Sequence, residues 1–117
     1  MLGYYLKLDQ SVLYNGNYSD SLTLTGTCYT DIGQTAAFNL TGYTLTLRFY
    51  TENGFVDNFN QTASITVAAS GTWSKAITSG TLPQAGFYLV DLSLTKSGTQ
   101  VSNLNRVEIL IKRGPTD

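Results

Sequence analysis

The sequence predicts an all-β domain, specifically an antiparallel β-sandwich of about seven strands. Apolar and polar residues alternate with a period of two in several separate runs, which is the pattern of strands that bury one face. Glycine-containing turn sequences separate these runs, and no window repeats apolar residues with the period of a helix. We therefore expect almost no helix. A small barrel is the competing architecture.

The strands follow from the alternation in chain order. In 44–50, for example, Leu45, Leu47 and Phe49 share one face, while threonines and Arg48 take the other. The same argument predicts weaker strands within 4–8 and 72–77, and clear ones at 22–28, 63–67, 87–95 and 106–112. We expect residues 9–20 and 29–42 to form loops or irregular edges.

The domain boundaries follow from the same pattern. A chain of 117 residues is the size of one domain, and no linker divides it. We expect an N-terminal arm or edge segment at 1–20, the sandwich at 21–113 and a short tail at 114–117.

The arm carries four tyrosines that show no stable period. Tyr4, Tyr5, Tyr14 and Tyr18 are separated by polar and glycine residues, so they cannot all face one core. We interpret them as residues that pack on a neighbouring protein.

The composition argues against most other classes of function. Seven Lys and Arg against eight Asp and Glu leave a formal charge of −1, so neither nucleic acid nor a membrane surface is an expected partner. The chain has no histidine, which removes the commonest general base and neutral metal ligand. Cys28 is the only cysteine, and it falls in phase with apolar neighbours. We expect no enzyme, no metal and no cofactor.

Two regions are candidates for a protein interface. The stretch 52–61 is polar and turn-rich, and it places Phe55 and Phe59 in what we expect to be a contact loop. Covering of these rings by the domain itself is the alternative.

The second candidate is the outer face of the strands at 44–50, 87–95 and 106–112, which should be neighbours in a sandwich. The alternation directs an Arg, a Tyr and three apolar side chains away from the core, a composition typical of an interface centre. These residues are Arg48, Tyr50, Phe87, Leu89 and Leu110.

Two segments carry a resemblance to a known class of proteins. The segments NLTGYTLTLRFY at 39–50 and LPQAGFYLVDL at 82–92 resemble the immunoglobulin-like domains of tailed-bacteriophage virion proteins, particularly the N-terminal domain of phage baseplate upper proteins. In that family an "LTG" step enters a strand and a "G-x-Y" step opens a late strand. The resemblance covers about 39–112, and it implies that the sandwich is immunoglobulin-like.

The resemblance and the missing catalytic residues together predict a function. We expect a non-enzymatic virion structural protein that binds and braces a larger assembly, either as a capsid decoration or cement protein or as a baseplate or tail accessory. Its partners would be other virion proteins, with self-association as a further option. No signal peptide or membrane span is visible at the N-terminus, so we expect synthesis in the host cytoplasm and a final place in the virion. The alternative is a carbohydrate-binding or host-adhesion module.

Overall fold

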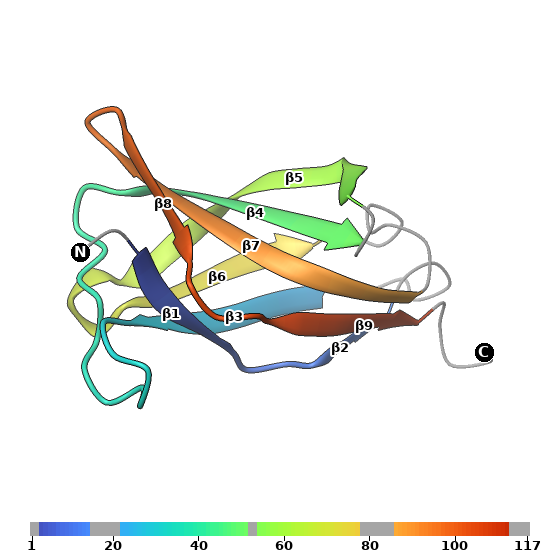
Figure 1. The fold of residues 1–117 in the computed structure, drawn as a ribbon, viewed down its shortest axis with the longest axis horizontal. Helices are drawn as coiled ribbons and strands as arrows, with labels where there is room; N and C mark the ends of the chain where they lie inside the picture. The colour runs from blue at the N-terminus through green and yellow to red at the C-terminus, as the bar shows by residue number, and fades with distance from the viewer. Residues whose placement is uncertain (1–2, 15–21, 52–53, 78–85, 113–117) are drawn as a thin grey trace.

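The computed structural model describes residues 3–14, 22–51, 54–77 and 86–112. Most of these residues lie in β-strands, and no α-helix occurs among them (Figure 1). The elements are β1 (Gly3–Leu8), β2 (Val12–Tyr14), β3 (Leu22–Tyr29), β4 (Thr44–Thr51), β5 (Gly54–Val67), the one-turn 3-10 helix η1 (Ala68–Ser70), β6 (Thr72–Ile77), β7 (Gly86–Lys96), β8 (Thr99–Asn103) and β9 (Glu108–Lys112). The all-β prediction is confirmed.

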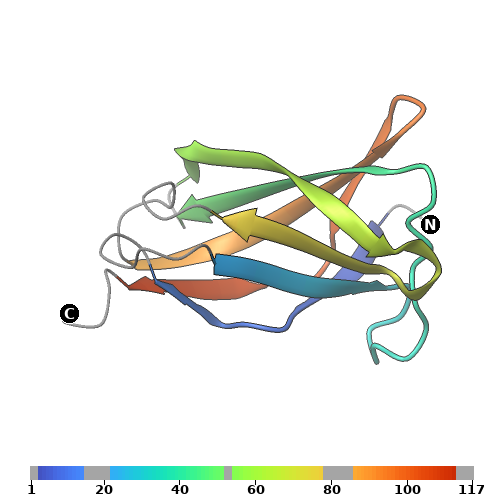
Figure 2. The same cartoon turned by 180° about the vertical axis from the view of Figure 1, so that it is seen from behind.

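The strands form a closed barrel, so the prediction of an immunoglobulin-like sandwich is wrong. Seven strands pair in the order β7-β4-β5-β6-β3-β1-β8, and β8 returns to β7. Two further strands, β9 and β2, continue the sheet from the other half of β7. Figures 1 and 2 show the two sides of this barrel, with β7 and β9 on one side and β3, β6 and β5 on the other.

Two features close the barrel instead of leaving two sheets. The first is the length of β5, whose 14 residues pair with β4 along Gly54–Ala63 and with β6 along Ser64–Val67. The second is β8, which forms a hairpin with β7 and then runs parallel to β1, where Gly3 pairs with Ser102 and Tyr4 with Asn103. One continuous ladder therefore surrounds the core.

Residues 54–61 form a strand and not the loop that we expected over 52–61. Residues 54–61 belong to β5 and form a ladder with β4, interrupted by a register shift between Arg48 and Tyr50. Phe55 and Phe59 therefore lie in a strand, while their side chains are outside the described part of the structure.

The part of the predicted N-terminal arm or edge segment that forms β1 is not an arm. β1 is paired on both sides, with β3 and with β8, and Tyr4 and Leu6 are fully buried. The Tyr4 hydroxyl donates a hydrogen bond to the carbonyl oxygen of Leu92 across the barrel. β2 does lie at an edge of the sheet, because among the described strands it pairs with β9 alone.

The barrel interior is filled by the residues that the alternation directs inward. Leu45, Leu47 and Phe49 of β4 are completely buried, as are Leu92 and Leu94 of the neighbouring β7. Among the described residues, the fully buried large side chains also include Trp73, Tyr4, Leu6, Leu24, Leu40 and Ile77.

Two asparagine side chains, one at the end of β8 and one between β8 and β9, form hydrogen bonds with backbone groups of β1 and β7. Asn105 accepts a hydrogen bond from the Leu6 N–H at 2.9 Å and donates to the Leu6 carbonyl at 2.8 Å. Asn103 likewise accepts from the Leu92 N–H and donates to the Val90 carbonyl, each at 3.1 Å. The side-chain amides thus replace the missing strand neighbours of β1 and β7.

Candidate functional site

The outer face of β9, β7 and β4 brings together the largest group of the predicted interface residues. These strands are neighbours in the sheet, as expected. Phe87 pairs directly with Leu110 of β9, and Leu89 pairs with Tyr50 of β4. Arg48 pairs with Asp91 one step further along. The antiparallel register therefore places side chains from distant parts of the sequence on one surface.

The alternation of each strand decides which side chains reach this surface. Tyr88, Val90 and Ile109 point into the barrel and are buried, whereas Phe87 is 73% exposed. Leu89 and Leu110 are half-buried on the outer side. A large aromatic ring near the start of a paired strand is thus left to solvent by the chain itself.

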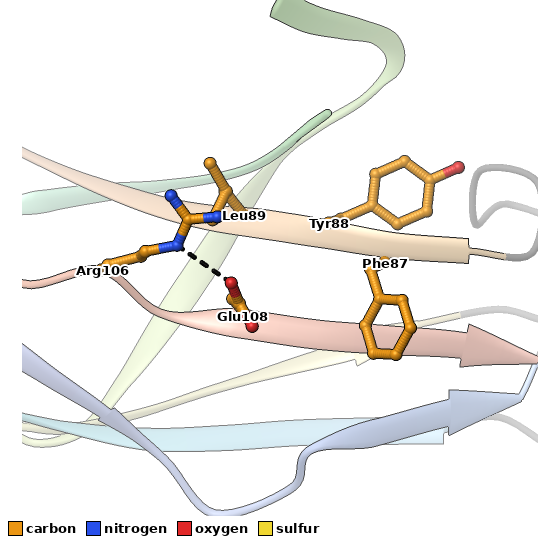
Figure 3. A pocket seen from close by; sticks show the side chains of 5 residues that line it. All are labelled: Phe87, Tyr88, Leu89, Arg106 and Glu108. Carbon is orange, nitrogen blue, oxygen red and sulfur yellow. Dashed lines mark hydrogen bonds and ion pairs between the residues drawn. The ribbon is translucent and has the colours of Figure 1, made fainter. Parts of the chain in front are cut away.

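The apolar part of the face runs across β2, β9 and β7. Phe87 contributes to two hollows in its surface. Val12 of β2 is paired with Leu110, which is paired with Phe87, so the three form one cross-strand row. One shallow hollow, of about 260 Å³, is lined by Ser11, Val12, Phe87, Glu108, Ile109 and Leu110. A smaller one is lined by Phe87, Tyr88, Leu89, Arg106 and Glu108, and Figure 3 shows the Phe87 ring between β7 and β9 there.

The opposite end of the face is polar and internally paired. Arg48 Nη2 lies 2.8 Å from Asp91 Oδ2, and the Tyr50 hydroxyl donates to the same oxygen at 3.3 Å. Ser93 donates to Asp91 at 3.0 Å, and Gln100 of β8 donates to Ser93 at 3.1 Å. Burial, followed by the nearby carboxylate of Asp91, raises the pKa of Tyr50. Arg48 and Tyr50 therefore form a fixed polar border to the apolar row.

An exposed ion pair lies at the edge of the apolar row. Arg106 Nε is 2.9 Å from Glu108 Oε2, and both side chains are more than half exposed. Glu108 lines both hollows, and Figure 3 shows the pair next to Leu89. Charged and apolar groups thus alternate on this rim.

The remaining predicted interface residues are elsewhere. Tyr4 is a core residue, so its assignment to an interface is corrected: both sides of β1 are paired and its ring is enclosed. Tyr5 is half-buried on β1, away from this face. Tyr14 lies in β2, but its side chain is outside the described residues, as is the whole of Tyr18.

Sequence reasoning missed four contributors to the face. Val12 falls in 9–20, where we expected loops or irregular edges, although the run Val-Leu-Tyr at 12–14 has strand-forming residues. Arg106 and Glu108 lie within the predicted strand 106–112, but their position beside Phe87 follows only from the β7–β9 register. Asp91 was also missed. The alternation places it on the outer face of β7, and pairing of β7 with β4 brings it opposite Arg48.

The described residues offer little for metal or thiol chemistry. Among them, no group of three or more acidic, cysteine or histidine side chains could hold a metal ion. Burial raises the pKa of the Cys28 thiol to about 12, which suppresses the nucleophilic thiolate. The described part of the chain contains no helix that is long and apolar enough to cross a membrane.

No known family model matches the chain, and a search of curated proteins gave no match either.

Proposed function

We propose that this protein is a non-enzymatic structural protein that binds a larger protein assembly through the outer face of β4, β7 and β9. One observation carries the proposal: Phe87, the second residue of the paired strand β7, is 73% exposed and is flanked by apolar residues. Burying such a ring contributes about 1.5–3 kcal/mol of binding free energy. The free chain gains nothing comparable from exposing it to water.

The surroundings of Phe87 have the composition of a protein interface. An aromatic anchor with aliphatic neighbours forms its centre, while Arg106, Glu108 and the Arg48–Asp91 pair form a polar border. Interfaces commonly combine a few buried anchors with a polar rim that excludes water. This arrangement favours a flat protein partner over a small molecule, since the hollows beside Phe87 are shallow.

We propose a bacteriophage virion as the setting. Support comes from the resemblance of 39–50 and 82–92 to virion proteins and from a chain without histidine. Barrel closure removes the immunoglobulin-like fold from that support. The docking face, in contrast, does not depend on the family assignment.

Incorporation into particles tests the proposal. Tagged wild-type chain and the Phe87→Lys variant are each produced in the phage host during assembly, and the purified particles are analysed by mass spectrometry. The wild-type chain is expected in the particles at a fixed ratio to the major structural protein. The Phe87→Lys variant is expected to fold and to be lost from the particles, because an ammonium group cannot be desolvated there without a partner.

Thr23→Lys is the matched control. Thr23 is exposed on β3, which lies three strands away from β7 around the barrel. This variant should enter particles like the wild type. Absence of the wild-type chain from particles, or equal incorporation of the Phe87→Lys variant, contradicts the proposal. Retention on a polysaccharide resin that free sugar reverses would instead support a carbohydrate-binding module.

A further inference from the structure

We propose that the protein covering this outer face is a second copy of the same chain, docked about a twofold axis. This inference rests on the proposed function, since it names the partner of the face. It begins from a projecting ring that lies directly beside a hollow. Phe87 projects from the face and also forms a wall of the larger hollow, together with Ser11, Val12 and Leu110.

The face carries both a projecting ring and a hollow. A twofold interface uses the same patch on both copies, so the patch must be complementary to itself. Rotation by 180° about an axis between the ring and the hollow carries each Phe87 ring to the hollow of the other copy. That hollow is about 260 Å³, whereas a cavity of roughly 150 Å³ accommodates a benzene ring. One face therefore supplies both the ring and its receptor.

The charges of the face favour the same partner. Arg106 and Glu108 are exposed beside the apolar row, and Arg48 and Asp91 form a second pair behind it. Cations and anions balance among these residues, so neither a strongly acidic nor a strongly basic partner is selected. A copy turned by 180° offers a carboxylate to each Arg106 and a guanidinium to each Glu108.

A twofold arrangement also doubles each favourable contact. One exposed Phe87 ring per chain becomes two buried rings per dimer, and the row of Val12, Leu110 and Phe87 lies against its own copy. The unit that braces the larger assembly is then a dimer, and a variant that cannot dimerise is expected to be lost from the particles.

Sedimentation velocity tests the dimer directly. The purified full chain is expected to sediment as a dimer at about 100 µM and to dissociate on dilution. Thr23→Lys should behave like the wild type. Phe87→Lys should be monomeric at every concentration with an unchanged circular dichroism spectrum.

A pair of charge-reversal variants identifies the partner as a second copy. Arg106→Glu makes the rim acidic and Glu108→Arg makes it basic, so each variant alone opposes like charges across the twofold axis. Each should dimerise at least about tenfold more weakly than the wild type. An equimolar mixture of the two should recover dimers, because every opposed pair is then of opposite sign.

A wild-type chain that remains monomeric up to about 1 mM overturns the inference, as does a mixture that recovers no dimer. The mixture decides the matter even if Phe87→Lys fails to fold. If the chain is monomeric but its incorporation into particles still depends on Phe87, the proposed function stands and the twofold partner does not. If dimers form but particles lack the chain, the dimer stands and the structural role does not.

Discussion

Phe87 of β7 and Leu110 of β9 are direct cross-strand neighbours on the outside of the barrel, although 23 positions separate them in the sequence. Phe87 is mostly exposed and Leu110 is half-buried, so the contact between them leaves most of the ring uncovered. The pair therefore has two conceivable roles, in holding β7 to β9 and in binding a partner.

A double-mutant cycle with Phe87→Thr and Leu110→Thr separates these roles. Threonine keeps the strand preference and removes the apolar contact. We expect a coupling free energy of unfolding of about 0.2–1 kcal/mol, the usual range for a cross-strand pair. Urea titration of the four proteins measures it. A coupling of several kcal/mol would assign Phe87 to the stability of the barrel instead of to docking.

Gly71 occupies a position where a side chain has no room. Its φ is +69°, and an added Cβ would collide with the carbonyl oxygen of Cys28 and lie 2.8 Å from that of Phe38. Gly98 has a similar φ of +83° but open space around it. Gly98→Ala should therefore lower the unfolding free energy by only about 1–2 kcal/mol, the cost of the left-handed conformation.

Gly71→Ala should cost clearly more, because the clashing backbone oxygens cannot move away. Urea unfolding of both variants gives the comparison. Equal losses for the two glycines would mean that the close approach of Gly71 to Cys28 and Phe38 carries no energetic weight.

Asn105 is expected to stabilise barrel closure. Its amide satisfies both backbone groups of Leu6, and Asn105→Ala leaves them without these partners. We expect a loss of about 1–3 kcal/mol of unfolding free energy and faster hydrogen exchange at the Leu6 amide. Asn60→Ala, at an exposed position of β5, is the control and should change neither quantity. Unchanged exchange at Leu6 in Asn105→Ala would show that β1 is held without the asparagine.

Cys28 is expected to lower the free energy of unfolding as the pH becomes alkaline. Burial raises its pKa from 9.0 to about 12, so the folded chain retains the proton after the unfolded chain has lost it. Its contribution is complete below pH 9 and decreases as the pH rises towards 12. Between pH 9 and 10 the wild type should lose about 1 kcal/mol more unfolding free energy than Cys28→Ala. Identical pH dependence of the two proteins would contradict the burial of this thiol.

Strand phases could be predicted from the sequence because they are encoded locally. Leu45, Leu47 and Phe49 are inward and Arg48 and Tyr50 outward, as the alternation indicated, since side chains switch faces at every residue. The same local rule placed Phe87, Leu89 and Leu110 on the outside. Five residues of the candidate face were therefore identified in advance.

Barrel closure could not be predicted in this way. The closing strand β8 has the sequence TQVSN, which contains one apolar residue, and it pairs with β1 from the other end of the chain. Such pairing depends on long-range geometry and leaves no periodic signal. Tyr4 was misassigned for a different reason. It was grouped with Tyr14 and Tyr18, although it lies two residues before Leu6 and shares the inward face of β1 with it.

Site-specific photo-cross-linking at position 87 tests most directly whether the outer face docks a protein. The chain with Phe87→p-benzoylphenylalanine is irradiated during particle assembly, and the same photoreactive residue at Thr23 serves as the control. We predict an abundant cross-link from position 87 to a protein of the assembly or to a second copy of the chain, and little from position 23. Cross-linking at position 87 no greater than at position 23 would contradict the account.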